Sequence, residues 1–437
     1  MFDRRRIFEH SPRWLYTLAP ALIVSTIAAT LIWMGPLPPR VVTMSTGAPG
    51  SDYALLAERF HAILERSGVE LRLIPSAGGV ENLQRLNDAR SGVAVGFAQG
   101  GLTNEVKSPE LISLGQMFFQ PLWCFSRVPP GVRLEGLRGK RISIGPEGSG
   151  TRALAEQWMG LSGITQDFAD WRSLPAARAG GALLKGDIDA AVIVASWDSQ
   201  VVRQLLASSA VDVINFPRAD AYVALNPYLT KLRLPAGVGD MATYRPITDV
   251  DLVAPKASLI VRREVHPAIQ YLLLEAATEI HSVPSIFQGF ERFPAAVRDD
   301  LPLSQNARQF YKSGTPFLQR YLPFWLAVFA SRMLLLLIPL GAVAYPVLSL
   351  VPAIYSWNTR RRIFRLYVEF RFIEDELQAQ SGTVTSELLA RLQRWDEHAH
   401  RLRVPMDFVP IVYSMRTHIA MLCAARPTHR DETAHPD

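Results

Sequence analysis

The sequence has little of what disulfide-rich domains, metalloenzymes and hydrolases depend on. Only two cysteines occur in 437 residues, which excludes a disulfide framework. The nine histidines are scattered without an H-x-x-H or H-E-x-x-H spacing, and no Gly-x-Ser-x-Gly elbow is present. The sequence therefore indicates no metal ion, no cofactor and no catalytic residue.

A concentrated basic surface is also missing. The formal net charge is +6, but acidic and basic side chains nearly balance between residues 40 and 320. The basic excess lies in the arginine-rich segments 4–6 and 360–365. A nucleic-acid-binding domain needs a basic face within its folded region, so no nucleic-acid partner is expected. Arginine clusters beside apolar runs are instead typical of membrane proteins.

Two long apolar runs are present. Residues 15–34 carry no charge and have about the length needed to cross a bilayer core. The alternative, a cleaved signal peptide, lacks an A-x-A site after the run. Residues 333–357 form a second uncharged run, and its length argues against a buried core helix. The apolar segment 321–331 either lies at the membrane interface or extends this span, with Arg332 near one surface.

The flanking arginines predict the topology, because basic residues favour the cytoplasmic side. Both termini are then cytoplasmic, and the central region lies outside the bacterial inner membrane. Cys124 would lie outside and Cys423 inside, so the two cannot pair. The expected parts are a cytoplasmic N-terminus (1–14), a transmembrane helix that serves as an uncleaved signal anchor (15–35), a periplasmic domain (40–320), a second transmembrane helix (333–357) and a cytoplasmic helical tail (358–437).

Within the central region, short apolar strands alternate with helical segments, which predicts α/β layers with parallel sheet. Three early strands each end in a loop of small and polar residues, at 45–53, 76–82 and 99–101. In open α/β sheets, ligands bind beyond the carboxyl ends of the strands. We therefore expect these three loops to form one wall of a binding cleft.

Residues 139–152 (GKRISIGPEGSGTR) combine a short buried strand, a turn of small residues and a helix that opens near Thr151. Such a turn lets the backbone approach a ligand closely, and the helix start favours a carboxylate or phosphate. Arg152 could add a bidentate positive charge. The spacing of Gly145 and Gly150 resembles a P-loop, but Thr151 and Arg152 replace the lysine and hydroxyl residue that nucleotide hydrolysis needs. A tight turn without a ligand remains the alternative.

The order of these motifs resembles the TAXI-type solute receptors, the substrate-binding proteins of a subgroup of TRAP transporters. Residues 78–83 (GGVENL), 139–152 and 184–191 (LKGDIDAA) carry the resemblance, which covers about residues 40–315. It implies a two-lobed, type II periplasmic-binding-protein fold that closes on a small organic anion without catalysis. The expected lobe 1 comprises about 40–125 and 215–315, and lobe 2 about 126–214. Two features depart from the family: Asp52 in a loop that is usually richer in glycine, and the two membrane spans.

The candidate ligand-binding residues come from the predicted loops and helix starts. For Tyr53 and Trp197, packing in a core is an equal alternative, and Arg152 could instead pair with Glu156 one turn along its helix. The carboxylate of Asp52 could repel an anion or receive an amino group. The candidates are Thr46, Gly47, Ser51, Tyr53, Gly78, Gly79, Asn82, Gln99, Ser149, Gly150, Thr151, Arg152 and Trp197.

The sequence thus predicts a membrane-tethered receptor for a small organic anion, either a dicarboxylate or an amino acid. Its expected partners are the inner membrane and a multi-span TRAP-type permease. The alternative is a ligand sensor or scaffold that signals to a partner protein through the cytoplasmic tail.

Overall fold

The computed structural model describes residues 13–127, 134–163, 169–281, 285–287, 293–297, 300–379, 390–391, 394–395, 397 and 409–424. The chain divides into two compact units. One is Pro36–Ser331, and the other combines Met1–Gly35 with Arg332–Asp437. Each unit is described separately below.

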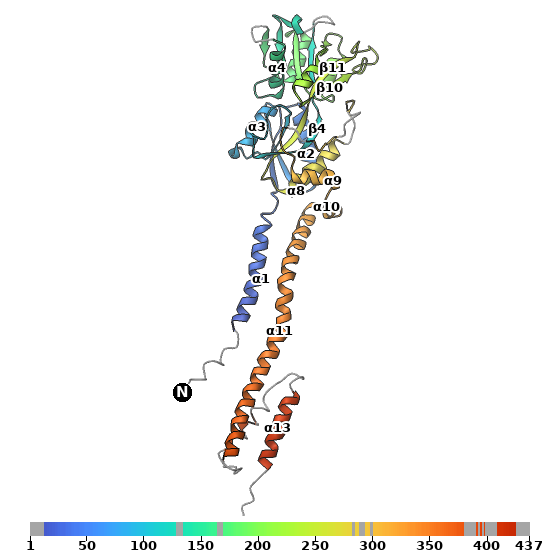
Figure 1. The fold of residues 1–437 in the computed structure, drawn as a ribbon. Helices are drawn as coiled ribbons and strands as arrows, with labels where there is room; N and C mark the ends of the chain where they lie inside the picture. Colours follow the sequence, from blue (N-terminus) through green and yellow to red (C-terminus); the bar gives the residue numbers. More distant parts are fainter. Residues whose placement is uncertain are drawn as a thin grey trace, which may run out of the picture. The chain divides into compact units, whose positions relative to one another are not determined.

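The unit Pro36–Ser331 contains two sheets, which lie in two lobes (Figure 1). The first sheet has the order β10-β11-β3-β1-β2, and β4 also pairs with β11. Its strands β1 to β4 lie in lobe 1, whereas β10 packs in the core of lobe 2. Strand β1 is parallel to β2 and β3, whereas β11 runs antiparallel to β3, β4 and β10. The strands are β1 (Val41–Ser45), β2 (Glu70–Ile74), β3 (Val95–Gln99), β4 (Leu111–Phe119), β10 (Leu229–Leu234) and β11 (Val250–Arg262).

The sheet of lobe 2 has the order β7-β6-β8-β5-β9. Its central strand β8 is parallel to β6 and antiparallel to β5. The α/β layers predicted from the alternating pattern are therefore present in both lobes. The strands are β5 (Leu122–Ser126), β6 (Arg141–Ser143), β7 (Asp170–Arg172), β8 (Ala190–Val194) and β9 (Asp212–Val213).

Helices cover the sheets of both lobes. Their apolar residues recur at helical spacing, as in α2, which buries Tyr53, Ala57, Phe60 and Leu64 along one face. Lobe 1 carries α2 (Asp52–Arg66), α3 (Gly79–Asn87), η1 (Ala89–Ser91), α8 (Pro267–Ile280) and α9 (Gln305–Ser313), followed by α10 (Phe317–Tyr321). Lobe 2 carries η2 (Leu134–Leu137), α4 (Gly150–Leu161), α5 (Ala176–Lys185), α6 (Gln200–Ala207) and α7 (Ala219–Leu225).

Two segments cross between the lobes. Strand β4 of lobe 1 continues through Gln120 and Pro121 into β5 of lobe 2. Strand β11 returns: its residues 250–254 pack in the core of lobe 2, and residues 257–261 pair with β3 in lobe 1. The chain therefore does not return to lobe 1 until the second half of β11. Residues 215–254 pack in the core of lobe 2, whereas the predicted boundary had placed them in lobe 1. Two crossing segments leave the lobes free to hinge about them.

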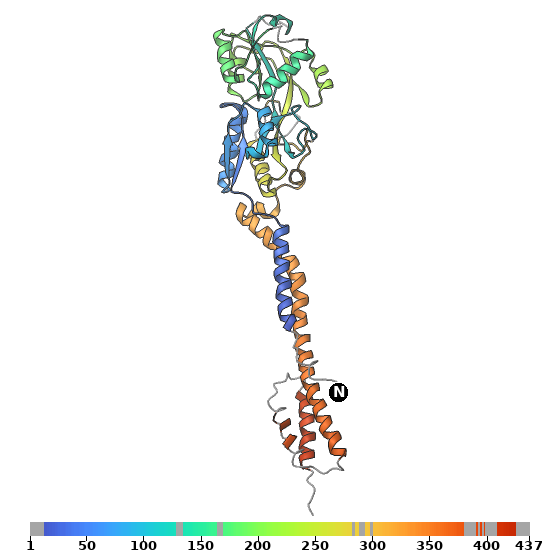
Figure 2. The same cartoon turned by 90° about the vertical axis from the view of Figure 1, so that its left-hand side faces the viewer.

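The second unit is helical. Helix α1 spans Arg13–Trp33, α11 spans Phe324–Ala379 without a break, and α13 spans Val409–Ala424. In both views α13 lies beside the C-terminal part of α11 (Figures 1 and 2). Among the described residues, one helical stretch, Phe324–Pro346, has the length and hydropathy to cross a membrane, and the apolar part of α1, Pro20–Trp33, is shorter.

The long helix α11 bears on the second predicted span. It begins at Phe324 and passes through Arg332 without a break, so residues 324–331 continue into the apolar run. The structure therefore favours the longer helix over a separate interfacial one. Arg332 donates from Nη1 to the carbonyl oxygen of Gly35 at 3.2 Å, within the same unit.

Candidate functional site

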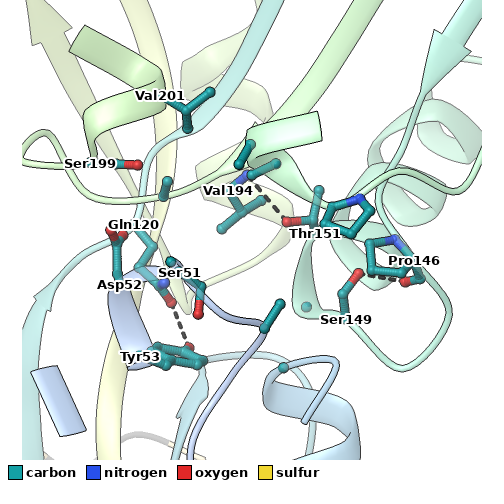
Figure 3. A pocket seen from close by; sticks show the side chains of 18 of the residues that line it. Ser51, Asp52, Tyr53, Gln120, Pro146, Ser149, Thr151, Val194, Ser199 and Val201 are labelled. Atoms are coloured by element: carbon teal, nitrogen blue, oxygen red, sulfur yellow. Dashed lines mark hydrogen bonds between the residues drawn. The ribbon is translucent and has the colours of Figure 1, made fainter. Parts of the chain in front are cut away.

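A cavity of about 340 Å³ lies between the two lobes. Lobe 1 contributes the loop 48–53, residues 77–79, Gln99 and Gln120. Lobe 2 contributes the turn around Ser149, the starts of α5 and α6, and the end of β8. The labelled residues in Figure 3 come from both lobes and surround the same space. The volume is at the small end of the range for small-molecule pockets.

Five helices begin at this cavity. They are α2 and α3 from lobe 1 and α4, α5 and α6 from lobe 2, and the first residues of each line the wall. The side chains of Ser51 and Ser149 cap α2 and α4, but no side-chain cap is present at α3, α5 or α6. A helix start exposes unpaired N–H groups and a partial positive charge. The cavity is therefore electrostatically suited to an anionic group.

The local sequence explains why these helices start where they do. Ser51 and Ser149 are extended residues whose hydroxyl oxygens accept from the backbone N–H of Ala54 and Arg152, at 3.4 and 3.2 Å. Gly78, at the start of α3, has a φ of +139°, which a residue with a Cβ rarely adopts. Each helix follows a strand, so all of these starts come to the carboxyl edges of the two sheets.

Asp52 is the one charged side chain among the described residues that line the cavity. Its Oδ2 accepts a hydrogen bond from the backbone N–H of Ser196, in the opposite lobe, at 2.5 Å. Burial raises the pKa of this carboxyl, and the nearby Asp198 raises it further, against the hydrogen bonds from Ser196. The side chain still reaches the solvent of the cleft. The site therefore holds an acidic group where its charge is poorly solvated.

Tyr53 and Gln120 form the floor of the cavity beside Asp52. The Tyr53 hydroxyl donates to Oε1 of Gln120 at 2.7 Å (Figure 3). Burial, followed by the charge of Asp52, raises the pKa of Tyr53 well above its usual value, so the phenol stays protonated and can donate. Gln120 lies on the first crossing segment, so this bond ties the cavity floor to the hinge.

Direct hydrogen bonds join the lobes across the cavity. Gln99 donates from Nε2 to the carbonyl oxygen of Gly150 at 3.0 Å, and the N–H of Glu81 donates to the carbonyl oxygen of Gly148 at 3.1 Å. The bond between Asp52 and Ser196 is a third. The structure is therefore that of a closed cleft.

Backbone conformation and the close approach of the opposite lobe explain the two glycines of the 148–150 turn. Gly148 has a φ of +75°, a conformation open mainly to glycine. A Cβ on Gly150 would lie 2.6 Å from Cδ of Gln99 and closer still to its Oε1. A larger residue at position 150 would therefore require the carboxamide of Gln99 to move.

Eight of the thirteen predicted site residues line the cavity. They come from four separate segments of the chain, which the fold brings together. These residues are Ser51, Tyr53, Gly78, Gly79, Gln99, Ser149, Gly150 and Thr151.

The other five do not line it. Arg152 donates to Glu156 (2.7 Å) and to Ser173 (2.9 Å), so the pairing along its own helix is the interpretation that the structure favours. Trp197 packs edge-on against Phe287. The last three, Thr46, Gly47 and Asn82, lie behind the wall.

Asn82 has a structural role behind that wall. It is fully buried, donates to the carbonyl oxygens of Thr46 and Phe97 and accepts from the hydroxyls of Ser45 and Ser76. These four bonds use its hydrogen-bonding capacity and fix the loops that follow β1 and β2 against strand β3. Asn82 thus supports the site without facing the ligand space.

Sequence reasoning did not find the contributions of Gln120, residues 175–177 and residues 199–201. Ser199 precedes a helix directly after a buried strand, which is the pattern that pointed to Ser149, so it could have been found. Gln120 and Pro175 carry no such signal, because only the crossing segment and the packing of α5 bring them to the cavity. Among the described residues, no three His, Cys, Asp or Glu side chains are grouped to hold a metal ion.

Residues 122–313 match the NMT1-like family. The match covers lobe 2 and the part of lobe 1 that follows it in the sequence, which together are less than half of the chain. Similar solved structures include a protein from Bordetella bronchiseptica RB50, with 15% identity over 64% of this chain and 91% of that chain and a TM-score of 0.40. The periplasmic aliphatic sulphonate binding protein SsuA from Escherichia coli has 13% identity over 74% and 85% of the two chains, with a TM-score of 0.35. The lipoprotein Tp32 from Treponema pallidum has 16% identity over 55% and 93%, with a TM-score of 0.33. Because the identities and TM-scores are this low, none of the three structures indicates which ligand this protein binds.

Proposed function

We propose that this protein is an extracytoplasmic receptor that binds a small organic anion between its lobes and does not catalyse a reaction. The observation that supports this most directly is the meeting of five helix starts, three of them without a side-chain cap, in one closed cleft of about 340 Å³. A ligand that contacts both lobes favours the closed state in proportion to its differential affinity for it.

The anionic group is a carboxylate in this proposal, and the ligand is a dicarboxylate or an amino acid. No arginine or lysine is among the described residues that line the cavity, so helix starts and polar side chains supply the complementary charge. In the part of the chain that the structure describes, the N–H groups of Gly150 and Thr151 have no protein acceptor. They and the starts of α5 and α6 would donate to the carboxylate oxygens.

The receptor is held in the bacterial inner membrane in this proposal, with both termini in the cytoplasm. The apolar stretch Phe324–Pro346 and the helix α1 support two anchors. Reporter fusions at residues 200 and 430 test the topology. We expect them on opposite sides of the membrane, and reporters on the same side would refute it.

The binding test uses the full-length chain in detergent, because the central unit has not been shown to fold alone. Thermal unfolding is followed with and without amino acids and dicarboxylates. A ligand that binds only the native state raises the melting temperature by mass action. At a concentration of 100 times its Kd, it adds about 2.7 kcal/mol to the free energy of unfolding. A response to at least one carboxylate is expected, and stable protein with no response to any would refute the proposal.

Delivery to a TRAP-type permease is the proposed biological role, and the resemblance of the 78–83 and 139–152 motifs supports it. Cross-linking and co-purification from the native membrane test this step separately. Recovery of a multi-span permease is the expected result. Recovery of a cytoplasmic protein alone would support the second function, described next.

The second candidate is a sensor that signals through the cytoplasmic tail, and one feature of the structure favours it. Helix α2 begins at Asp52 in the cavity and ends beside Gly68, where the indole Nε1 of Trp325 would lie 3.0 Å from a Cβ. Trp325 packs on the core of lobe 1 and is in the first turn of α11, which continues unbroken to Ala379. One helix thus joins the cleft to the helix that leads to the tail.

A further inference from the structure

The charges around the cavity are arranged unevenly. Figure 3 shows Asp52 on one side of the ligand space and Ser149 with Thr151 on the other. The side of Ser149 carries the start of α4 with free N–H groups. The side of Asp52 carries the one ionisable acid that lines the cavity in the described part of the chain. A ligand that fills the cavity therefore meets a positive field at one end and a carboxylate at the other.

Within the protein, the charge of Asp52 is offset by the start of α2, in whose first turn it lies, and by the N–H of Ser196, but by no cation among the described residues that line the cavity. Its carboxyl is partly buried, the neighbouring acid Asp198 repels it, and Ser196 supplies the hydrogen bonds that favour its charged form. No described lysine or arginine reaches the cavity to neutralise it. An ammonium group of the ligand would provide the missing charge, whereas a second carboxylate there would add repulsion in a weakly solvated site.

We propose that Asp52 determines specificity by binding the ammonium group of a zwitterionic ligand, so that the receptor accepts α-amino acids and rejects dicarboxylates without an amino group. This inference rests on the proposed receptor function and selects one of the two ligand classes that it leaves open. The α-carboxylate lies at the starts of α4 and α5, and the ammonium group lies between Asp52 and the Tyr53–Gln120 pair.

The test compares ligands that differ only in the amino group. L-glutamate is paired with glutarate, L-alanine with propionate, and L-leucine with 4-methylpentanoate, and each is titrated into the full-length protein in detergent by calorimetry. The variant is Asp52→Asn, which keeps an oxygen that can accept from Ser196. The control is Asp198→Asn, which removes the same charge from an exposed neighbour that does not line the cavity.

For the wild type and the control variant, we expect the amino member of at least one pair to bind at least about 30-fold more tightly than its partner, which corresponds to about 2 kcal/mol. In Asp52→Asn, that ratio should fall to within about threefold. If Asp52 only holds the cleft closed, the variant will weaken both members of a pair equally, and this would overturn the inference. The melting temperature of each variant without ligand shows that it is folded.

The remaining outcomes separate this inference from the proposed function. Binding of glutarate or propionate as tight as that of the amino member would refute the role of Asp52 while leaving a carboxylate receptor in place. Failure of every compound, amino or not, would refute both proposals.

Discussion

The inter-lobe contact at Gly150 makes the closed cleft experimentally accessible. We predict that Gly150→Ala opens the cleft without unfolding lobe 2. The new Cβ would lie 2.6 Å from Cδ of Gln99, far inside an ordinary contact distance, so the carboxamide must move. Gln99 then loses its 3.0 Å hydrogen bond to the carbonyl oxygen of Gly150.

The loss of that hydrogen bond sets how strongly the closed state is disfavoured. Gln99 is buried, with 5% of its surface exposed, and leaving a buried polar group unpaired costs about 1–3 kcal/mol. The closed state should therefore be disfavoured about 5-fold to 150-fold relative to the open one. Alanine also raises the propensity for helix at this position, but α4 is present in both states, so this gain does not affect the balance between them.

The assay is the distance between spin labels on the two lobes of the full-length protein. Ala89 in lobe 1 and Lys185 in lobe 2 are both exposed, and Cys423 is first replaced by serine. Cys124 is buried, and burial raises the pKa of its thiol to about 12, so it should not react with the label. We expect a longer distance in Gly150→Ala, and weaker binding of any ligand found by thermal shift.

Gly160→Ala is the matched control, because it lies in the same helix and a Cβ there would meet nothing within 4 Å. It should leave the distance unchanged and stabilise α4 by about 0.5–1 kcal/mol. A Gly150→Ala protein with the wild-type distance and an affinity within about twofold would refute the inter-lobe reasoning.

Three further predictions concern stability, measured by denaturant or thermal unfolding. Gly115→Ala should cost at least about 2 kcal/mol, because Gly115 has a φ of +121° and a Cβ would lie 2.7 Å from the carbonyl oxygen of Ala295; a loss below about 0.5 kcal/mol would contradict this. Burial, followed by the charge of Arg59, lowers the pKa of His281 from 6.5 to about 4. The native state therefore binds fewer protons than the unfolded state between these values. As the pH is lowered from 6.5 to 4, the stability of the wild type should decrease more steeply than that of His281→Gln. Equal slopes would refute the assignment. Because burial raises the pKa of Asp52, the native state holds that proton more strongly than the unfolded state, and stability is lost as pH rises above 3.8. The melting temperature of Asp52→Asn, measured without ligand, should therefore gain on that of the wild type as the pH rises above 3.8, and a difference that stays constant from pH 3 upward would contradict it.

Local signals in the sequence located much of the site. The small-residue loops after β1, β2 and β3 and the turn before α4 were each recognisable as a strand end followed by a helix start. Such patterns depend on neighbours within a few residues, so they can be read without the fold. Eight residues chosen in this way line the cavity.

Side-chain direction could not be read in the same way. Arg152 is the third residue of α4, and the turn of the helix places its guanidinium beside Glu156 and Ser173 instead of in the cleft. Asn82 is polar and lies next to a glycine-rich turn, yet it is fully buried among the loops that it connects. The pairing of Arg152 with Glu156 is local, but its bond to Ser173 and the burial of Asn82 depend on contacts between segments that are separated in the sequence.

The α/β class, many of the helix starts and the presence of an apolar run after residue 320 follow from the sequence, because hydrophobic periodicity, capping residues and run length act locally. The tertiary structure alone decided where the lobes divide, through the single long strand β11, which packs in both cores. It also decided that Asp52 faces Ser196 from the other lobe and lies in a cleft among five helix starts. The energy of a buried charge depends on everything that surrounds it, and in this protein those surroundings come from segments more than a hundred residues apart.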